Sequence, residues 1–194
     1  FVFHHGNAFE REDQTIVLDS ICYPSFPEVD PDMDFRKVNF EAMDPGQLWR
    51  FTLNLQGESV QRELLSSRCV EFPALHPHRV GRNYRYLYLG TAHNKRGNAP
   101  LQGILKMDLH TQNQQLYSFA PKGYVGEPIF VPKPGSIEED AGWLLVMVYD
   151  AGQHRSDLVI LDAQQIEQGA IARLHLRYHI PYGLHGSWTP VRFL

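Results

Sequence analysis

Short runs in which apolar and polar residues alternate, each ended by turn-forming residues, recur along most of the chain. Residues 51–55 alternate in this way before the turn at 56–58, and residues 84–89 alternate before Gly90. Successive side chains of a strand point to opposite faces of a sheet, so a period of two indicates strands with one covered face. The pattern predicts an all-β fold, and a hydrophobic content of 43% is sufficient to build its core.

Two pairs of these runs are close enough in the sequence to form β-hairpins. Residues 104–109 and 115–119 are joined by a short polar connection, and residues 143–149 and 156–162 are joined by turn-forming residues that include Gly152. Strand pairs recur about every 20–25 residues, which is typical of stacked four-stranded propeller blades and also of a β-sandwich. The spacing alone does not choose between these two architectures.

Helix-forming patterns are rare, and long loops separate some of the strands. Residues 163–168 are compatible with one helical turn, which Gly169 ends. The proline-rich stretch from Tyr23 to Pro45 is predicted to be a long loop with a short helix over residues 34–39. A length of 194 residues without a shift in composition favours a single domain over residues 1–194.

Charge and cysteine content restrict the classes of function. A net charge of −4 and a pI near 6.2, without a run of Lys or Arg, exclude nucleic acid as an expected partner. The apolar runs are far shorter than the ~18–20 residues of a membrane-spanning helix. Two cysteines are too few for a disulfide framework, which favours a reducing, cytoplasmic location. Because the chain begins with Phe1 inside a predicted strand, we expect the sequence to be part of a longer protein.

Two histidines near opposite ends of the chain stand in settings that favour a functional role. His4 lies beside His5 in an otherwise apolar strand-like run, and His185 lies between Gly183 and Gly186. Glycine lets the backbone approach a bound group closely, so an imidazole flanked by glycines is a candidate metal ligand. The alternative is a structural histidine in a strand, which is the more common case before this context is considered.

Glu71 and Glu127 are carboxylates with apolar neighbours in strand-like segments. Glu127 precedes Pro128, which restricts its backbone to an extended conformation, and Pro73 stiffens the chain after Glu71. A buried carboxylate requires a partner, and the Nδ1–H group of a metal-binding imidazole is one such partner. A glutamate at the exposed end of a strand is an equally plausible alternative.

Other candidates for chemistry are weaker. His76 and His78 flank a proline in a loop, and the remaining histidines lie in polar turns or beside strands, where structural roles are favoured. The sequence contains neither the nucleophile elbow of a serine hydrolase nor a glycine-rich phosphate loop.

Five sequence blocks together resemble the C-terminal portion of the carotenoid cleavage oxygenase family. This family includes apocarotenoid-cleaving enzymes, lignostilbene dioxygenases and the retinal pigment epithelium isomerase. The blocks, in the order of the family, are residues 3–10 (Phe-His-His-Gly-Asn-Ala-Phe-Glu), 71–73, 127–132, 139–145 with 149–150, and 179–186. Together they span nearly the whole chain, in the order of the family.

The resemblance implies that the chain supplies the C-terminal blades of a seven-bladed β-propeller with Fe(II) on its axis, held by four histidines. It implies that His4 is the third iron ligand and His185 the fourth, while His5 is not a ligand. It further implies that Glu71 orients the imidazole of His4 and that Glu127 orients that of His185. The other two histidines, and one more glutamate, belong to a preceding half of the propeller that these 194 residues do not include.

The resemblance also implies a reaction in which dioxygen splits one C=C bond of a hydrophobic polyene, a carotenoid or an apocarotenoid, into two carbonyl products. Such a substrate requires an apolar tunnel, and it partitions into bilayers, so peripheral contact with a membrane is compatible with this activity. Five aromatic residues are candidates to line the tunnel: Phe26, Phe119, Tyr124, Trp143 and Trp188.

Three alternatives stay open beside this reading. A stilbene-cleaving or a retinoid-isomerising relative would share the same blocks around the metal. A noncatalytic β domain that binds an apolar ligand or partner is favoured by the absence of two iron ligands from the sequence. We expect the 194-residue chain in isolation to be inactive, because two histidines alone make a weak metal site.

Overall fold

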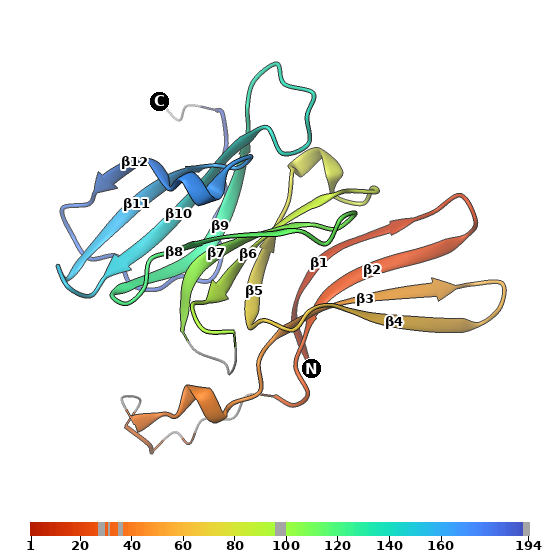
Figure 1. Ribbon diagram of the computed structural model, residues 1–194, viewed down its shortest axis with the longest axis horizontal. Coiled ribbons are helices and arrows are strands. Elements are labelled where there is room, and N and C mark those ends of the chain that lie inside the picture. The colour runs from red at the N-terminus through yellow and green to blue at the C-terminus, as the bar shows by residue number, and fades with distance from the viewer. Residues whose placement is uncertain (27–29, 31, 35–36, 96–99, 192–194) are drawn as a thin grey trace.

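The computed structural model describes residues 1–26, 30, 32–34, 37–95 and 100–191. In this part of the chain the strands form three four-stranded antiparallel sheets, which confirms the predicted all-β fold (Figure 1). Each sheet is a meander, in which strands that follow one another in the sequence lie side by side. Helical structure within the described residues is limited to short 3-10 turns, as the sequence predicts.

The strands are divided among the sheets in groups of four along the chain. The first sheet contains β1 (Val2–Glu10), β2 (Thr15–Cys22), β3 (Gln47–Asn54) and β4 (Ser59–Ser66). The second sheet contains β5 (Val70–Ala74), β6 (Tyr86–Ala92), β7 (Leu101–Asp108) and β8 (Gln114–Ser118). The third sheet contains β9 (Gly123–Pro132), β10 (Gly142–Asp150), β11 (Arg155–Asp162) and β12 (Ala170–His175).

Both predicted hairpins are present. β7 pairs with β8 around Leu105 opposite Leu116, and β10 pairs with β11 along its whole length, beginning with Trp143 opposite Asp162. The pairs keep large apolar side chains on one face because the register preserves the period of two in both strands.

The predicted helical turns are shorter than expected. Of the predicted turn over residues 163–168, Ile166–Gln168 is helical, as a 3-10 turn, and it ends at Gly169, where the φ of +88° favours glycine. Residues 35–36 of the predicted helix over 34–39 lie outside the described residues, and a 3-10 turn occupies Phe40–Ala42.

The second sheet lies between the other two and is covered on both faces. Leu87 and Leu89 of β6 belong to the apolar core shared with the first sheet. Tyr88, between them in the sequence, belongs to the core shared with the third sheet, where it meets Leu144 and Val146. Because neighbouring residues of a strand point to opposite faces, a strand covered on both sides loses its polar face. This explains why β6 is buried without interruption after its first residue.

The first strand of each sheet lies toward a common centre. β1 contacts β5, and β5 contacts β9, so the three sheets meet along their first strands and diverge toward their last (Figure 1). Meanders stacked in this way are the blades of a propeller, whereas a sandwich would place two sheets face to face. The tertiary structure therefore decides between the two architectures that the strand spacing left open.

Asn7 of β1 ties the first sheet to the connection between β5 and β6. Its side-chain Nδ2 donates to the backbone oxygens of Arg79 and Arg82, both at 3.0 Å, and its Oδ1 accepts from the backbone N–H of Gly81 at 2.9 Å. The residue is only 7% exposed. The two hydrogen bonds that this buried amide donates and the one that it accepts therefore hold β1 in its place beside β5.

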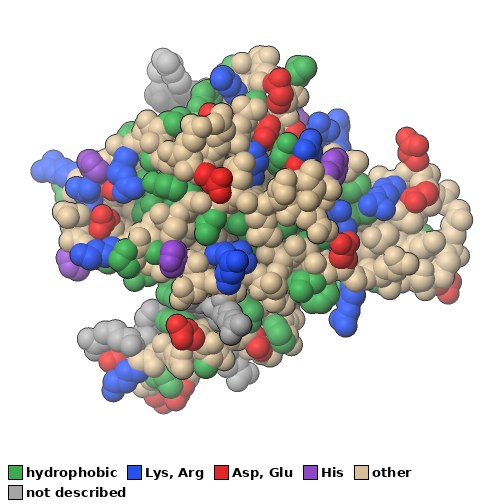
Figure 2. All heavy atoms as spheres, viewed as in Figure 1, with side chains coloured by type: hydrophobic (Ala, Val, Ile, Leu, Met, Phe, Trp, Pro, Cys, Tyr) green, Lys and Arg blue, Asp and Glu red, His purple; other side chains and the backbone are tan. Residues whose placement is uncertain are grey.

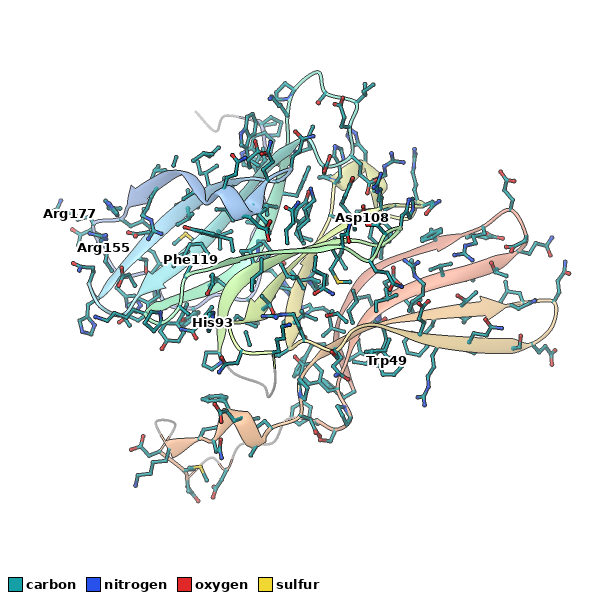
Figure 3. All side chains as sticks on the ribbon, in the orientation of Figure 1. Trp49, His93, Asp108, Phe119, Arg155 and Arg177 are labelled. Carbon is teal, nitrogen blue, oxygen red and sulfur yellow. The ribbon has the colours of Figure 1, made fainter. Side chains whose placement is uncertain are left out.

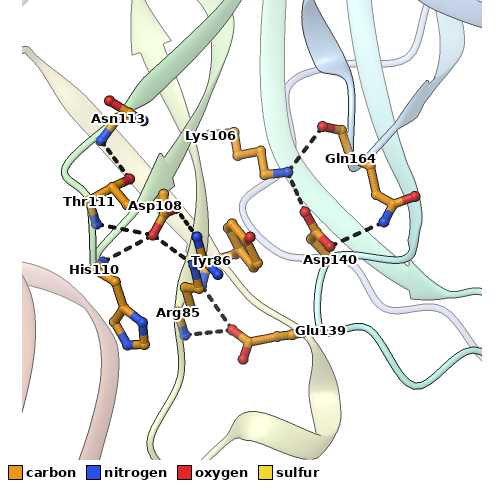
Figure 4. A network of polar contacts seen from close by, with 10 residues as sticks. All are labelled: Arg85, Tyr86, Lys106, Asp108, His110, Thr111, Asn113, Glu139, Asp140 and Gln164. Carbon is orange, nitrogen blue, oxygen red and sulfur yellow. Dashed lines mark hydrogen bonds and ion pairs between the residues drawn. The ribbon is translucent and has the colours of Figure 1, made fainter.

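A polar network joins the second sheet to the third (Figure 4). Lys106 of β7 donates to Asp140 at 2.7 Å and to the backbone oxygen of Gln164 at 3.2 Å, and Glu139 accepts from the backbone N–H of Tyr86 at 2.8 Å. Lys106 is 5% exposed, so its ammonium group depends on these partners for solvation. The network fixes the loop before β10 against the second sheet.

The face of the molecule shown in Figure 2 carries charges of both signs interspersed over the blades. Within the described residues, no helix has the length and the apolar character needed to cross a lipid bilayer.

Candidate metal centre

The imidazoles of His4 and His185 meet in space although 181 residues separate them in the sequence. His4 lies on β1, and His185 lies in the segment that follows β12. Their Nε2 atoms are 3.3 Å apart, and the two rings are nearly perpendicular, with an interplanar angle of 88°. The two ring nitrogens therefore face the same small volume beside the first strands of the sheets.

The direction of His4 follows from an irregularity in β1. The register of β1 against β2 shifts on both sides of His5, and such bulges re-aim side chains. His5 points elsewhere, with its Nδ1 2.8 Å from the hydroxyl of Ser20 on β2. Of the two adjacent histidines, only His4 reaches His185.

Glu71 of β5 contacts Nδ1 of His4, the ring nitrogen that does not face His185. Its Oε2 lies 2.5 Å from Nδ1 of His4 and also accepts from the backbone N–H of Phe72 at 2.8 Å. Its Oε1 accepts from the hydroxyl of Tyr23 at 3.0 Å. Glu71 is 9% exposed, and these donors satisfy a carboxylate that would otherwise be destabilising at this depth.

Glu127 of β9 contacts Nδ1 of His185, the ring nitrogen that does not face His4. Its Oε1 lies 3.1 Å from Nδ1 of His185, and its Oε2 accepts from the backbone N–H of Gly186 at 2.8 Å. A Cβ at Gly186 would lie 3.0 Å from the side chain of Ile129, so glycine permits the close approach of this segment to β9. The His185 side chain is 58% exposed, which makes this half of the pair the more open one.

The hydrogen bonds fix the chemical character of the two rings. A neutral imidazole whose Nδ1–H donates to a carboxylate presents the Nε2 lone pair as a ligand. With this tautomer in both rings, the two Nε2 lone pairs would face the same small volume, as two ligands of one cation do. Two nitrogens that each lie about 2.1 Å from one metal ion can be at most about 4 Å apart, so a separation of 3.3 Å would allow both to bind the same ion. The residues present therefore fit two adjacent positions of a metal ion.

The described residues bring together this pair of candidate ligands but no larger cluster. Within the ranges that the structure describes, no group of three or more His, Cys, Asp or Glu side chains is placed to hold a metal ion. The histidines that the sequence left as structural lie apart from the pair. His175, for example, contacts Asp157 at 2.9 Å, and His154 contacts the hydroxyl of Tyr149 at 3.0 Å.

Phe72 and Tyr23 also belong to the site, and the sequence reasoning did not find them. The Phe72 ring lies 5.1 Å from the His4 ring and 6.2 Å from the His185 ring, so it packs against both imidazoles. Its φ of +53° is rare for a bulky residue, and no local sequence pattern predicts this conformation. Tyr23 lies 48 residues from Glu71, at the start of the proline-rich loop, and only the fold brings them together.

The aromatic residues predicted to line a tunnel have different environments. Phe26 is 54% exposed and packs with Phe1 and Phe3, next to His4 in the sequence. Phe119, labelled in Figure 3, packs with Tyr117 against the core between the second and third sheets. Phe119 therefore contributes to the packing between these two sheets.

The remaining predicted tunnel residues lie on or after the third sheet. Tyr124 faces Tyr149 across the β9–β10 pair, Trp143 faces Val131, and Trp188 is 45% exposed. An apolar cavity of about 180 Å³ lies beside the metal centre, between β9, β10 and the C-terminal segment. Its lining includes Glu127, Ile129, Met147, Tyr182, Leu184 and His185.

Comparison with known proteins identifies related sequences and structures. Residues 1–190 match the family described as retinal pigment epithelial membrane protein. The apocarotenoid-15,15'-oxygenase of Synechocystis sp. is 61% identical over 97% of this chain and 38% of its own length. The carotenoid cleavage oxygenase of Mycobacterium tuberculosis is 31% identical over 98% of this chain and 38% of its own length. The crystal structure of cobalt-substituted Synechocystis ACO superposes with a TM-score of 0.93, at 60% identity, over 97% of this chain and 39% of that one.

These comparisons extend over nearly all of the present sequence. The chain spans about two fifths of the length of the relatives it matches.

Proposed function

The chain belongs to the retinal pigment epithelial membrane protein family of carotenoid cleavage oxygenases, and from that premise we propose that it forms part of an Fe(II)-dependent dioxygenase. The proposed enzyme cleaves a C=C bond of a carotenoid or an apocarotenoid with dioxygen and releases two carbonyl products. The observation that carries the proposal is the pair of facing Nε2 atoms of His4 and His185, each backed by a glutamate. The family match and the activities for which the relatives are named support the same conclusion.

His4 and His185 are the residues that would hold the metal ion. When bound, a ferrous ion with neutral imidazole ligands would supply the open positions at which dioxygen and an electron-rich alkene can react. Glu71 and Glu127 keep the Nδ1–H groups occupied, which fixes the tautomer of both rings and leaves Nε2 available. Phe72 packs against both imidazoles and adds an apolar surface beside them.

The proposed architecture of the whole protein is a seven-bladed propeller. Three four-stranded sheets occupy a chain that spans 39% of the related cobalt-substituted enzyme, a share close to three blades of seven. We place the remaining iron ligands in polypeptide outside the present 194 residues. The isolated chain should then bind Fe(II) weakly and should not bleach a polyene.

The proposed substrate is an apocarotenoid. The relative with 61% identity carries that substrate in its name, and the match extends over 97% of this chain. An apolar polyene also suits the exposed aromatic group of Phe1, Phe3 and Phe26, because its binding is dominated by removal of apolar surface from water.

Histidine replacement tests the proposal directly. In the protein at its native length, His4→Ala and His185→Ala should each abolish bound iron and polyene cleavage, whereas His154→Ala in a distant turn should retain both. Iron content is measured by elemental analysis and cleavage by loss of polyene absorbance, with product masses to identify the carbonyl compounds. Unchanged iron content in both histidine variants would remove the ligand assignment.

The second candidate is a noncatalytic β domain that binds an apolar ligand, favoured by the presence of only two candidate ligands among the described residues. That candidate predicts polyene binding without iron and without carbonyl products. A stilbene-cleaving or retinoid-isomerising relative would bind iron but would give different products from the same assay, so the product masses separate all of these functions.

A further inference from the structure

The hydroxyl of Tyr23 contacts the carboxylate that binds the His4 ring. It donates to Oε1 of Glu71 at 3.0 Å, while Oε2 of the same carboxylate binds Nδ1 of His4. Burial raises the pKa of Tyr23 far above its ordinary value, and the neighbouring Glu71 carboxylate raises it further. The phenol therefore stays protonated and acts as the donor in this bond.

The surroundings hold the Tyr23 ring in one place. Tyr23 is 6% exposed, belongs to the core between the first two sheets, and packs edge-on against Phe3 at 5.4 Å. A Cβ at Gly46 would lie 2.5 Å from Cζ of Tyr23 and 2.6 Å from its hydroxyl, so only glycine leaves room for the phenol. The backbone oxygen of Gly46 in turn accepts from the N–H of Val70, the residue before Glu71.

Three separate donors thereby fix the orientation of one carboxylate. The Phe72 N–H and the His4 ring bind one oxygen, and Tyr23 binds the other from the loop that follows β2 of the first sheet. Glu127 differs, because its two donors are the adjacent residues His185 and Gly186 and therefore move together. Rotation of the Glu71 carboxylate would break the Tyr23 bond, so the phenol opposes any rotation that would release His4.

We propose that Tyr23 is a positioning residue of the metal centre, which acts through Glu71 to hold the His4 imidazole in its metal-binding direction. This inference rests on the proposed function, since it requires His4 to be a ligand. Gly46 is part of the same device, because it provides the space in which the phenol sits. Tyr23 itself touches neither of the two facing nitrogens.

The chain offers a matched control for a buried tyrosine that binds a carboxylate. Tyr84 is 3% exposed and donates to Oδ2 of Asp19 at 2.6 Å, and Arg50 completes that cluster. Tyr84→Phe removes the same hydroxyl from the same kind of bond in the same core, but its carboxylate binds no candidate ligand. It should lower the melting temperature and leave metal affinity unchanged.

The test measures metal dissociation constants in the protein at its native length, with Co(II) and with anaerobic Fe(II) as probes. Tyr23→Phe should raise the Kd about 3- to 10-fold, less than direct loss of an orienting carboxylate, and should shift the Co(II) absorption bands. Gly46→Ala keeps the Tyr23 hydroxyl but displaces it, so it should also raise the Kd and shift the Co(II) absorption bands. Adding Tyr23→Phe to Glu71→Ala should have no further effect, because the phenol acts only through that carboxylate.

The outcomes separate this inference from the proposed function. A Kd for Tyr23→Phe within about twofold of wild type, or a full additional effect on Glu71→Ala, overturns the role of Tyr23. If His4→Ala and His185→Ala still bind metal, both the proposed function and this inference fail. If those variants lose the metal while Tyr23→Phe and Gly46→Ala bind it as wild type does, only the inference fails. A Tyr23→Phe protein that does not fold is replaced by Gly46→Ala, whose Kd decides the matter.

Discussion

Glu127→Gln should weaken metal binding more than Glu71→Gln, although Glu71 is the more buried carboxylate. Glutamine keeps the shape of glutamate but replaces one oxygen acceptor by an NH2 donor. At Glu127, one oxygen faces Nδ1 of His185 and the other faces the N–H of Gly186. Both of these groups are donors when His185 binds a cation through Nε2. The new NH2 group must therefore face a donor in either orientation.

At Glu71 the replacement meets a group that can reverse its role. One oxygen faces the His4 ring and the Phe72 N–H, but the other faces the hydroxyl of Tyr23, which can accept as well as donate. The Glu71→Gln side chain can keep its carbonyl toward His4 and donate its NH2 group to Tyr23. Only the negative charge is then lost.

The magnitudes follow from these contacts. A hydrogen bond to a charged group contributes about 1.5–3 kcal/mol and a neutral one about half as much, so Glu71→Gln should raise the Kd ~3- to 12-fold. Glu127→Gln loses one such bond entirely, which corresponds to ~10- to 100-fold. The His185 side chain is 58% exposed, and water that replaces part of the lost bond brings the expected value to about 10- to 20-fold.

Anaerobic equilibrium dialysis of Co(II) and Fe(II) against a competing chelator measures these Kd values. Glu63→Gln on the exposed strand β4 serves as the control for the loss of one carboxylate charge. Combining Glu71→Gln with Tyr23→Phe should remove the acceptor for the NH2 group and raise the Kd to that of Glu127→Gln or above. Equal Kd values for the two single glutamine variants, or the reverse order, would refute the reasoning from donor geometry.

Two further predictions concern stability. Asn7→Ala removes three hydrogen bonds that hold β1 to the β5–β6 connection, so urea unfolding should show a loss of ~2–4 kcal/mol, whereas Asn83→Ala at an exposed position should show almost none. Burial raises the pKa of Asp157, but hydrogen bonds from His175, Arg155 and Arg173 outweigh it and hold the pKa below its ordinary value near 3.8. The carboxylate therefore stabilises the fold above about pH 4 and ceases to do so as the pH falls through its lowered pKa, so Asp157→Asn should flatten the acid side of the stability profile; an unchanged slope would contradict this.

Local patterns in the sequence were sufficient to predict the strands and to identify the candidate residues of the metal centre. The period of two in runs such as 143–149 and 156–162 predicted both hairpins, because a strand with one covered face must alternate. The settings of His4, His185, Glu71 and Glu127 marked all four as candidates for a metal centre, and the structure pairs each imidazole with one of the two glutamates. The resemblance to carotenoid cleavage oxygenases, drawn from five blocks, is confirmed by the family match over residues 1–190.

The sequence by itself determined which residues are apolar, which can turn and which can bind a metal ion, since these are properties of single residues and their near neighbours. The tertiary structure alone decided that the sheets stack as blades and that Nε2 atoms 181 residues apart face one another at 3.3 Å. It alone placed Tyr23 behind Glu71 and gave Phe72 its left-handed backbone. Contacts of this kind depend on the packing of β1, β5 and β9 around a common centre. Packing between strands that are distant in the sequence produces no periodic pattern of residues, so the sequence alone does not predict it.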